Sequence, residues 1–280
     1  MPVRHFNRYL WLGLLGGGVV IAAYSYIYLG RPLPGAWNET LEALLISLAA
    51  LGSAAMATLV WRHFPAADRG PRGVWGNFAI AFWLWAIAET IIFGYCLLSL
   101  TPPTLSPADA FWLVGYAFFA GALIHQYRLI YRSTRRHEAR LTLGVVGGSL
   151  VVSLSLAALF QLFFRSETTW LEDFVYALYP ILDLALGFAA FRLVYAFGGK
   201  LWSRPWMGLF VFAVADGAYA WLILIGVYAS LVTSGNPLGL AADLVYLSAY
   251  LVVTLACLSQ LLLLQYGLPR STMPEPESQA

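Results

Sequence analysis

The stretch VYALYPILDLALG, residues 175–187, places two residues that disfavour a membrane helix inside a long apolar run. Pro180 lacks a backbone donor, and Asp183 brings a carboxyl group three residues later. A charge at the centre of a bilayer costs about 2.5–3.5 kcal/mol even on insertion scales. We therefore expect Pro180 to kink a membrane helix and Asp183 to face the protein interior.

The composition of the whole chain is that of an integral membrane protein. Hydrophobic residues make up 60% of its 280 residues, charged residues only 11%, and the mean hydropathy is +0.72. Soluble domains carry about 25% charged residues. We predict an all-α membrane protein with eight transmembrane helices, because eight apolar runs approach or exceed the roughly 20 residues that a span needs: about 9–29, 40–62, 76–100, 109–131, 141–164, 173–196, 206–231 and 238–265.

The basic residues are distributed unevenly along this pattern. With the amino terminus on the cytoplasmic side, only Arg31 and Arg165 of the 16 basic residues fall on the opposite side. The positive-inside rule then places both termini in the cytoplasm. The chain is thus expected to be a multi-pass protein of the bacterial inner (cytoplasmic) membrane, with the lipid bilayer as its first partner.

Four short motifs occur twice, in the same order and at offsets of about 130 residues. We interpret the chain as two tandem four-helix repeats in parallel orientation. The repeats would span 1–135 and 136–266, followed by a disordered, polar tail at 267–280. The matched motifs are LGLLGGGVV (12–20) with LGVVGGSLV (143–151), WNETLEAL (37–44) with WLEDFVYA (170–177), FWLWAIAET (82–90) with LFVFAVADG (209–217), and ADAFWLVGY (108–116) with ADLVYLSAY (242–250).

Two helix starts carry capping residues. Ser106 and Asp109 form a capping box around Pro107, and Asn236 precedes Pro237 in the same way. We assign Ser106, Asp109, Asn236 and the kink-forming Pro180 structural roles.

Four further carboxyl groups fall inside predicted spans, and no lysine or arginine is expected at their depth. Such groups face the bundle interior, where they are hydrogen-bonded, protonated or paired with a ligand. We expect them to line one acidic and aromatic pocket for a small cationic or amphipathic ligand. The alternative is that each acid is neutral and only joins neighbouring helices. The candidate ligand-binding residues are Glu89, Asp183, Asp216, Asp243, Tyr116, Tyr179, Tyr219 and Tyr250.

Other chemistries find little support in the sequence. His125 is the one histidine well inside a span, and no metal-ligand cluster is present, so we expect neither a metal nor another cofactor. No arrangement of nucleophile and base, and no nucleic-acid platform, is evident. We therefore predict no catalytic residues.

Four segments resemble the multi-spanning amino-terminal membrane domains of bacterial GGDEF, EAL and PAS signalling proteins. They are SPADAFWLVGY (106–116), YPILDLAL (179–186), VADGAYAWL (214–222) and ADLVYLSAYLVVTLA (242–256). The resemblance covers about residues 40–265 and implies a sensory input module.

The family's motif positions fall on residues already identified as candidates: Asp109 and Tyr116, Tyr179, Pro180 and Asp183, Asp216 and Tyr219, and Asp243 and Tyr250. Glu89 departs from the aspartate expected there. The larger departure is that no output domain follows, which implies that the signal passes to a separate effector or membrane-protein partner.

We thus expect a non-enzymatic sensor-like or accessory membrane protein. A small proton- or cation-coupled transporter is the first alternative. A membrane enzyme that uses the intramembrane carboxyl groups on a lipid-like substrate is the second.

Overall fold

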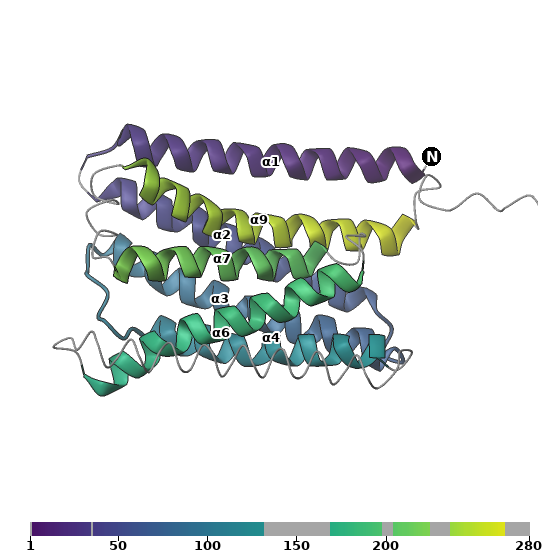
Figure 1. Ribbon diagram of the computed structural model, residues 1–280. Helices are drawn as coiled ribbons and strands as arrows, with labels where there is room; N and C mark the ends of the chain where they lie inside the picture. The colour runs from purple at the N-terminus through teal and green to yellow at the C-terminus, as the bar shows by residue number, and fades with distance from the viewer. Residues whose placement is uncertain (1, 35, 132–168, 198–203, 225–235, 267–280) are drawn as a thin grey trace, which may run out of the picture.

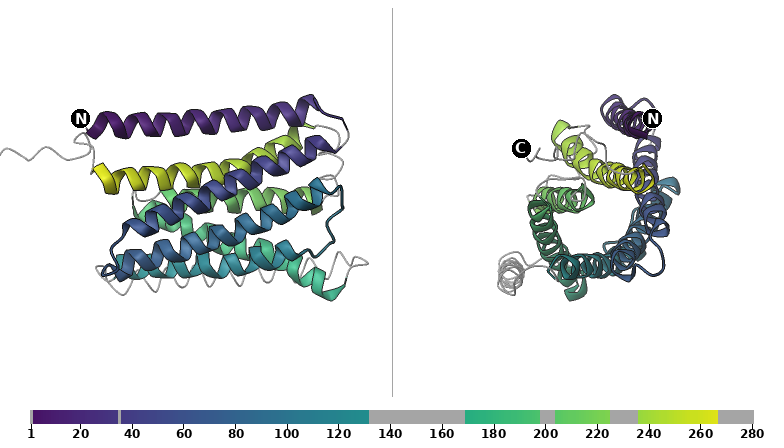
Figure 2. Two further views of the ribbon diagram at one scale, coloured as in Figure 1. Left: turned by 180° about the vertical axis from the view of Figure 1, so that it is seen from behind. Right: turned by 90° about the vertical axis from the view of Figure 1, so that its right-hand side faces the viewer.

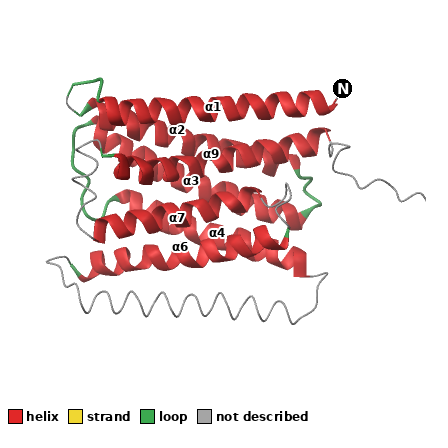
Figure 3. Cartoon of the chain, turned by 45° about the horizontal axis from the view of Figure 1, so that its top comes forward, coloured by secondary structure: helices red, strands yellow, loops and turns green. Residues whose placement is uncertain are grey.

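The computed structural model describes residues 2–34, 36–131, 169–197, 204–224 and 236–266. These residues form seven helices and, within the described ranges, no strand (Figure 3). The predicted span at 141–164, the end of the span at 206–231 and the tail at 267–280 lie outside the described residues. The helices are α1 (Pro2–Gly30), α2 (Trp37–His63), α3 (Arg69–Leu97), α4 (Pro107–Tyr131), α6 (Trp170–Ala196), α7 (Arg204–Leu224) and α9 (Pro237–Tyr266).

Six of these helices form a closed ring. Each of α2, α3, α4, α6 and α7 packs on the next described helix, and α9 returns to α2 (Figure 2). Helix α1 lies outside the ring, against both α2 and α9. Helices α2, α4, α6 and α9 begin at the end of the ring opposite the N-terminus, which we call the distal end (Figure 1).

The ring interior is filled by aromatic side chains. Phe82 of α3 is fully buried and makes edge-on contacts with Phe119 of α4 and Tyr250 of α9. Phe212 of α7 packs edge-on against Trp85 of α3, with ring centroids 5.0 Å apart. Because edge-on aromatic pairs contribute about 0.5–1.5 kcal/mol beyond their buried area, these contacts hold the two sides of the ring together.

Small residues set the closest helix contacts. A β-carbon at Gly208 of α7 would collide with Val253 of α9, and one at Gly187 of α6 would collide with Ala213 of α7. Such close approach is typical of helix packing in membranes, where small residues bring backbones together. These glycines place α7 tightly between α6 and α9.

The cap residues act at the starts of α4 and α9. The backbone amide of Ser106 donates to Asp109 Oδ2 at 2.7 Å, and the amide of Ala108 donates to Ser106 Oγ at 3.2 Å. The amide of Leu238 donates to Asn236 Oδ1 at 2.9 Å. These bonds satisfy amides that lack a partner within the helix.

Helix α6 begins with a complete capping box. The amide and hydroxyl of Thr169 donate to Glu172 Oε2, and the amide of Glu172 donates back to Thr169 Oγ1. These hydrogen bonds to the ionised carboxylate lower the pKa of Glu172 below its ordinary value. Pro180 lies inside α6, and the helix continues through it to Ala196.

Six described helices, all except α7, are long and apolar enough to cross a membrane. Only 6% of the most apolar window of α1 is buried inside the protein, whereas 56% of the corresponding window of α9 is buried. A helix that exposes so much apolar surface needs a lipid environment, because water would oppose that exposure. The chain is therefore an α-helical membrane protein in which α9 is the most buried of these six helices and α1 the least.

Candidate functional site

The four predicted intramembrane acids face the ring interior on four different helices. Glu89 lies on α3, Asp183 on α6, Asp216 on α7 and Asp243 on α9. Exposure is 6% for Glu89, 5% for Asp183 and 4% for Asp243, whereas Asp216 keeps more accessible surface. Glu89 lies eight residues before the end of α3, about 12 Å along the helix at 1.5 Å per residue. Asp183 is the middle residue of α6, and Asp243 lies six residues after the start of α9. These three acids therefore lie between the distal end and the middle of the ring.

The carboxyl groups of Asp183 and Asp216 lie next to each other between α6 and α7. An ionised carboxyl group only accepts hydrogen bonds, so a hydrogen bond between these two groups would require a proton on one of them. Asp183 also accepts a hydrogen bond from the hydroxyl of Tyr116, which comes from α4. Side chains of α4, α6 and α7 thus meet at this pair of carboxyl groups.

Glu89 receives two tyrosine hydroxyls from α9. Tyr250 donates to Glu89 Oε1 at 2.9 Å, and Tyr246 donates to the same oxygen. The two hydroxyl oxygens lie 3.4 Å apart. The indole nitrogen of Trp112 lies near this carboxyl group without hydrogen-bond geometry. Glu89 thereby joins α3 to α9 across the ring interior.

Two reciprocal bonds join α4 to α6. Helix α4 supplies Tyr116 to Asp183, and α6 supplies Tyr179 to Asp109 Oδ1 at 2.8 Å. Asp109 therefore has two roles, because its second oxygen caps α4. Asp109 and Tyr116 lie two helical turns apart, which places them on one face of α4. Each helix gives the other one hydroxyl donor and one carboxyl acceptor.

Asp243 belongs to the most distal part of this network. It accepts a hydrogen bond from Tyr219 of α7 and lies close enough to Glu42 of α2 for their charges to interact. Glu42 itself is 5% exposed, and Arg31 lies 3.9 Å from its Oε1 atom. Arg31 forms its closer ion pair with Glu39, at 2.6 Å.

All eight candidate ligand-binding residues therefore take part in hydrogen bonds between helices in the ring interior. The predicted set did not include Tyr246, although it donates to Glu89, and it did not include Glu42. Tyr246 lies one helical turn before Tyr250, so the two share a face of α9. This spacing could have added Tyr246 to the predicted set. For Glu42, the sequence indicated a position near a helix end, and burial at that end has no local sequence signal.

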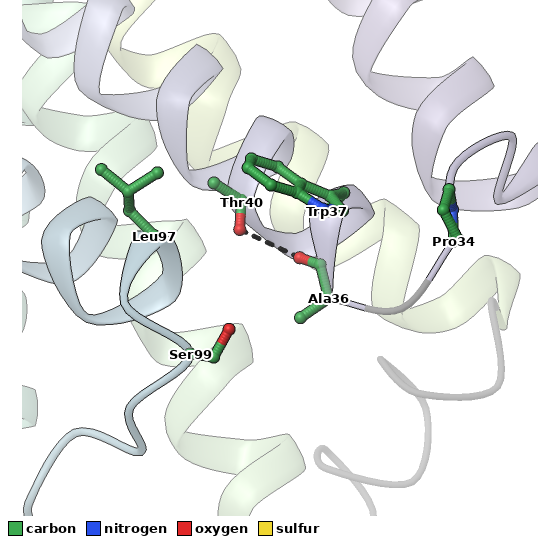
Figure 4. Close-up of a pocket in the computed structure, with 6 residues that line it drawn as sticks. All are labelled: Pro34, Ala36, Trp37, Thr40, Leu97 and Ser99. Atoms are coloured by element: carbon green, nitrogen blue, oxygen red, sulfur yellow. Dashed lines mark hydrogen bonds between the residues drawn. The ribbon is translucent and has the colours of Figure 1, made fainter.

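A surface pocket of about 300 Å³ lies at the distal end, away from these acids (Figure 4). It lies between the first turn of α2 and the end of α3. Its lining contains none of the predicted site residues: Pro34, Ala36, Trp37, Thr40, Leu97 and Ser99. Within the described ranges, no group of three or more histidine, cysteine or acidic side chains has the arrangement of a metal site.

A comparison of the chain with models of known families, with curated proteins and with solved structures found no significant match.

Proposed function

We propose that this protein is a non-enzymatic membrane sensor whose input site is the carboxyl–tyrosine network inside the ring. The observation that carries the proposal is the geometry of the Asp183–Asp216 pair, two neighbouring carboxyl groups on α6 and α7 with a hydrogen bond from Tyr116 of α4. Because two such close carboxyl groups resist ionising together, we propose that they share one proton. A cationic group that replaced this proton would change contacts among α4, α6 and α7 together. Binding at the pair would thereby alter the arrangement of the ring.

The surroundings of the pair favour a small cationic or amphipathic ligand. Tyrosine and tryptophan rings surround the acids, with the Trp85 and Tyr116 rings 5.3 Å apart and the Tyr116 and Tyr179 rings 6.2 Å apart. Aromatic faces attract cations, and carboxyl groups supply the counter-charge. Asp216 is less buried than Asp183, so under this proposal it is the member of the pair that a ligand reaches first.

The resemblance to the membrane domains of GGDEF, EAL and PAS proteins supports a signalling role. Under this proposal the chain reports to a separate effector or membrane-protein partner in the bacterial inner membrane. We also propose eight spans in two parallel four-helix repeats, with both termini cytoplasmic. The matched contact order of α2, α3 and α4 and of α6, α7 and α9 is consistent with such repeats.

The experiment that tests this function is a ligand screen by thermal unfolding of the purified full chain in detergent. Alkyltrimethylammonium ions and primary alkylamines below their micellar concentrations are suitable probes. A ligand present at 100 times its Kd stabilises the folded state by about 2.7 kcal/mol. We expect a shift in the wild-type protein, loss of that shift in Asp183→Asn, and retention of it in Asp68→Asn, a matched change at an exposed acid.

Equal shifts in the wild-type protein and Asp183→Asn would remove the pair from the binding site. The absence of a shift with every probe would count against a cationic ligand.

A proton-coupled transporter is the second candidate, and the closeness of the Asp183 and Asp216 carboxyl groups inside the ring is the observation that favours it. Acid chains inside membrane helices form proton relays in pumps and transporters. Proteoliposomes with an internal pH dye test this function directly. Cation-driven proton movement that disappears in Asp216→Asn would support transport over sensing.

A further inference from the structure

The ring has two junctions between its first helices, α2 to α4, and its last, α6 to α9. At the α2–α9 junction, small side chains bring the backbones together. Ser53 Oγ donates to the carbonyl oxygen of Tyr250 at 2.8 Å and lies 3.0 Å from Thr254 Oγ1, with Gly52 beside the same threonine. Helix α1 packs against both α2 and α9 and covers this junction (Figure 2).

At the α4–α6 junction, by contrast, the helix backbones pack less closely. This junction is the sparsest helix contact of the ring, and long tyrosine side chains bridge it. Tyr116 reaches Asp183, Tyr179 reaches Asp109, and Tyr127 donates to the carbonyl oxygen of Ala189 at 2.8 Å. Hydrogen bonds between side chains can exchange partners without disrupting a packed backbone interface. This junction is therefore the one at which the ring can part at least cost.

The three tyrosine hydrogen bonds across this junction differ in their acceptor groups. Two of them end on carboxyl groups of the network and lie toward the distal end, where a ligand head group can replace the hydroxyl donor. The Tyr127 bridge ends on a backbone carbonyl nearer the other end and offers no such exchange. Parting of α4 and α6 would thus begin at the distal end, with Tyr127 as the pivot.

We infer that the α4–α6 junction is a lateral gate, through which an amphiphile with a cationic head group passes from the bilayer to the Asp183–Asp216 pair. The α2–α9 junction is the fixed side of the ring. The identity of what passes rests on the proposed function, whereas the opening itself follows from the two junctions. The tests below need no ligand, so they can fail or succeed independently of the ligand screen.

The first test measures distances between spin labels on the full chain in nanodiscs, with Cys96 and Cys257 replaced by alanine. Three label pairs report on the distal half of the gate, on its pivot and on the fixed side. Each labelled position has an exposed side chain, so the labels should not disturb packing. The pairs are Val114 with Leu184, Ile124 with Phe191, and Leu48 with Ala241.

The double variant Tyr116→Phe/Tyr179→Phe should lengthen the Val114–Leu184 distance and leave the Leu48–Ala241 distance unchanged. Tyr26→Phe, at an exposed tyrosine of α1, is the matched control and should change neither distance. An unchanged Val114–Leu184 distance would overturn the gate. Equal lengthening of both distances would also overturn it, because the whole ring would then have loosened.

A second variant keeps the test decisive if the double variant folds poorly. Tyr127→Phe should lengthen the distance at the pivot, between Ile124 and Phe191, because it removes the bond to Ala189. No change at the pivot in a folded Tyr127→Phe protein would show that tyrosine bridges do not hold the junction.

The second test measures access to the acids with two carbodiimides, which react with protonated carboxyl groups. The lipid-soluble dicyclohexylcarbodiimide should modify Asp183 or Asp216 roughly eightfold faster in the double variant than in the wild-type protein. That ratio corresponds to about 1.2 kcal/mol, or two average hydrogen bonds between membrane helices. Mass spectrometry of peptides identifies the modified residue.

Equal acceleration by a water-soluble carbodiimide would show access from the aqueous phase and would overturn a lateral route. An unchanged rate with the lipid-soluble reagent would overturn the gate itself.

Discussion

The contact between Glu89 and its two tyrosines makes a quantitative prediction. Tyr246 and Tyr250 donate to the same oxygen of Glu89, and their hydroxyl oxygens are 3.4 Å apart. Removal of either hydroxyl leaves the carboxyl group one donor. Each single change, Tyr246→Phe or Tyr250→Phe, should therefore cost about 0.6 kcal/mol of unfolding free energy, the average for a hydrogen bond between membrane helices.

The double variant Tyr246→Phe/Tyr250→Phe should lose much more unfolding free energy than the two single variants together. It leaves a buried carboxyl oxygen of Glu89 without a tyrosine donor, and an unsatisfied buried group costs about 1–3 kcal/mol. We expect a total of about 2–3 kcal/mol and hence a coupling energy of about 1–2 kcal/mol.

Reversible unfolding of the four proteins in mixed micelles of sodium dodecyl sulfate and dodecyl maltoside, followed by circular dichroism, measures this cycle. Tyr26→Phe, at a tyrosine that is 67% exposed, is the control and should be neutral. Additive single effects, within about 0.5 kcal/mol, would refute the shared-acceptor geometry.

Three further predictions concern the frame that holds the network. Gly115→Ala should destabilise the protein by about 1–3 kcal/mol, because the new methyl group would collide with the Trp85 side chain, whereas Gly94→Ala, in open space, should not; unfolding free energies compare the two. Ser53→Ala should cost up to about 1.7 kcal/mol in the same assay, since it removes the hydrogen bond to the α9 backbone, and a neutral result would argue against a fixed α2–α9 junction. The pKa of Glu172 is lowered in the folded state. The capping box therefore stabilises the folded protein fully at pH values above the ordinary glutamate pKa of about 4.3. This contribution is lost as the pH falls through the lowered pKa of the folded state. The difference in thermal midpoint between the wild-type protein and Glu172→Gln should therefore be constant at neutral pH and disappear in acid; a difference that persists in strong acid would contradict this sign.

The helices were the most predictable part of the structure. Apolar runs of sufficient length indicate membrane helices because unpaired backbone groups are excluded from lipid. The boundaries were less accurate, since α3 begins at Arg69 rather than near residue 76. Polar residues such as Arg69 and Arg72 extend that helix beyond its apolar part, and hydropathy does not detect such an extension.

The inward direction of the acids was also predictable, whereas their partners were not. Hydropathy indicates that Asp183 avoids lipid, and helical spacing indicates that Asp109 and Tyr116 share a face of α4. Neither property determines which helix that face meets. The reciprocal bonds between α4 and α6 depend on the order of helices around the ring, which a single sequence does not encode locally. For the same reason, the pairing of Asp183 with Asp216 needed the structure.

We infer that Asp183 and Asp216 share one proton inside the ring. Infrared spectroscopy of the purified protein at neutral pH tests it through the carbonyl stretch of protonated carboxyl groups. If the proton is shared, Asp183→Asn and Asp216→Asn should each lose the same part of this band, and the double variant should lose no more than either single one. Full retention of the band in both single variants, or losses that add in the double variant, would show that the two groups do not share a proton.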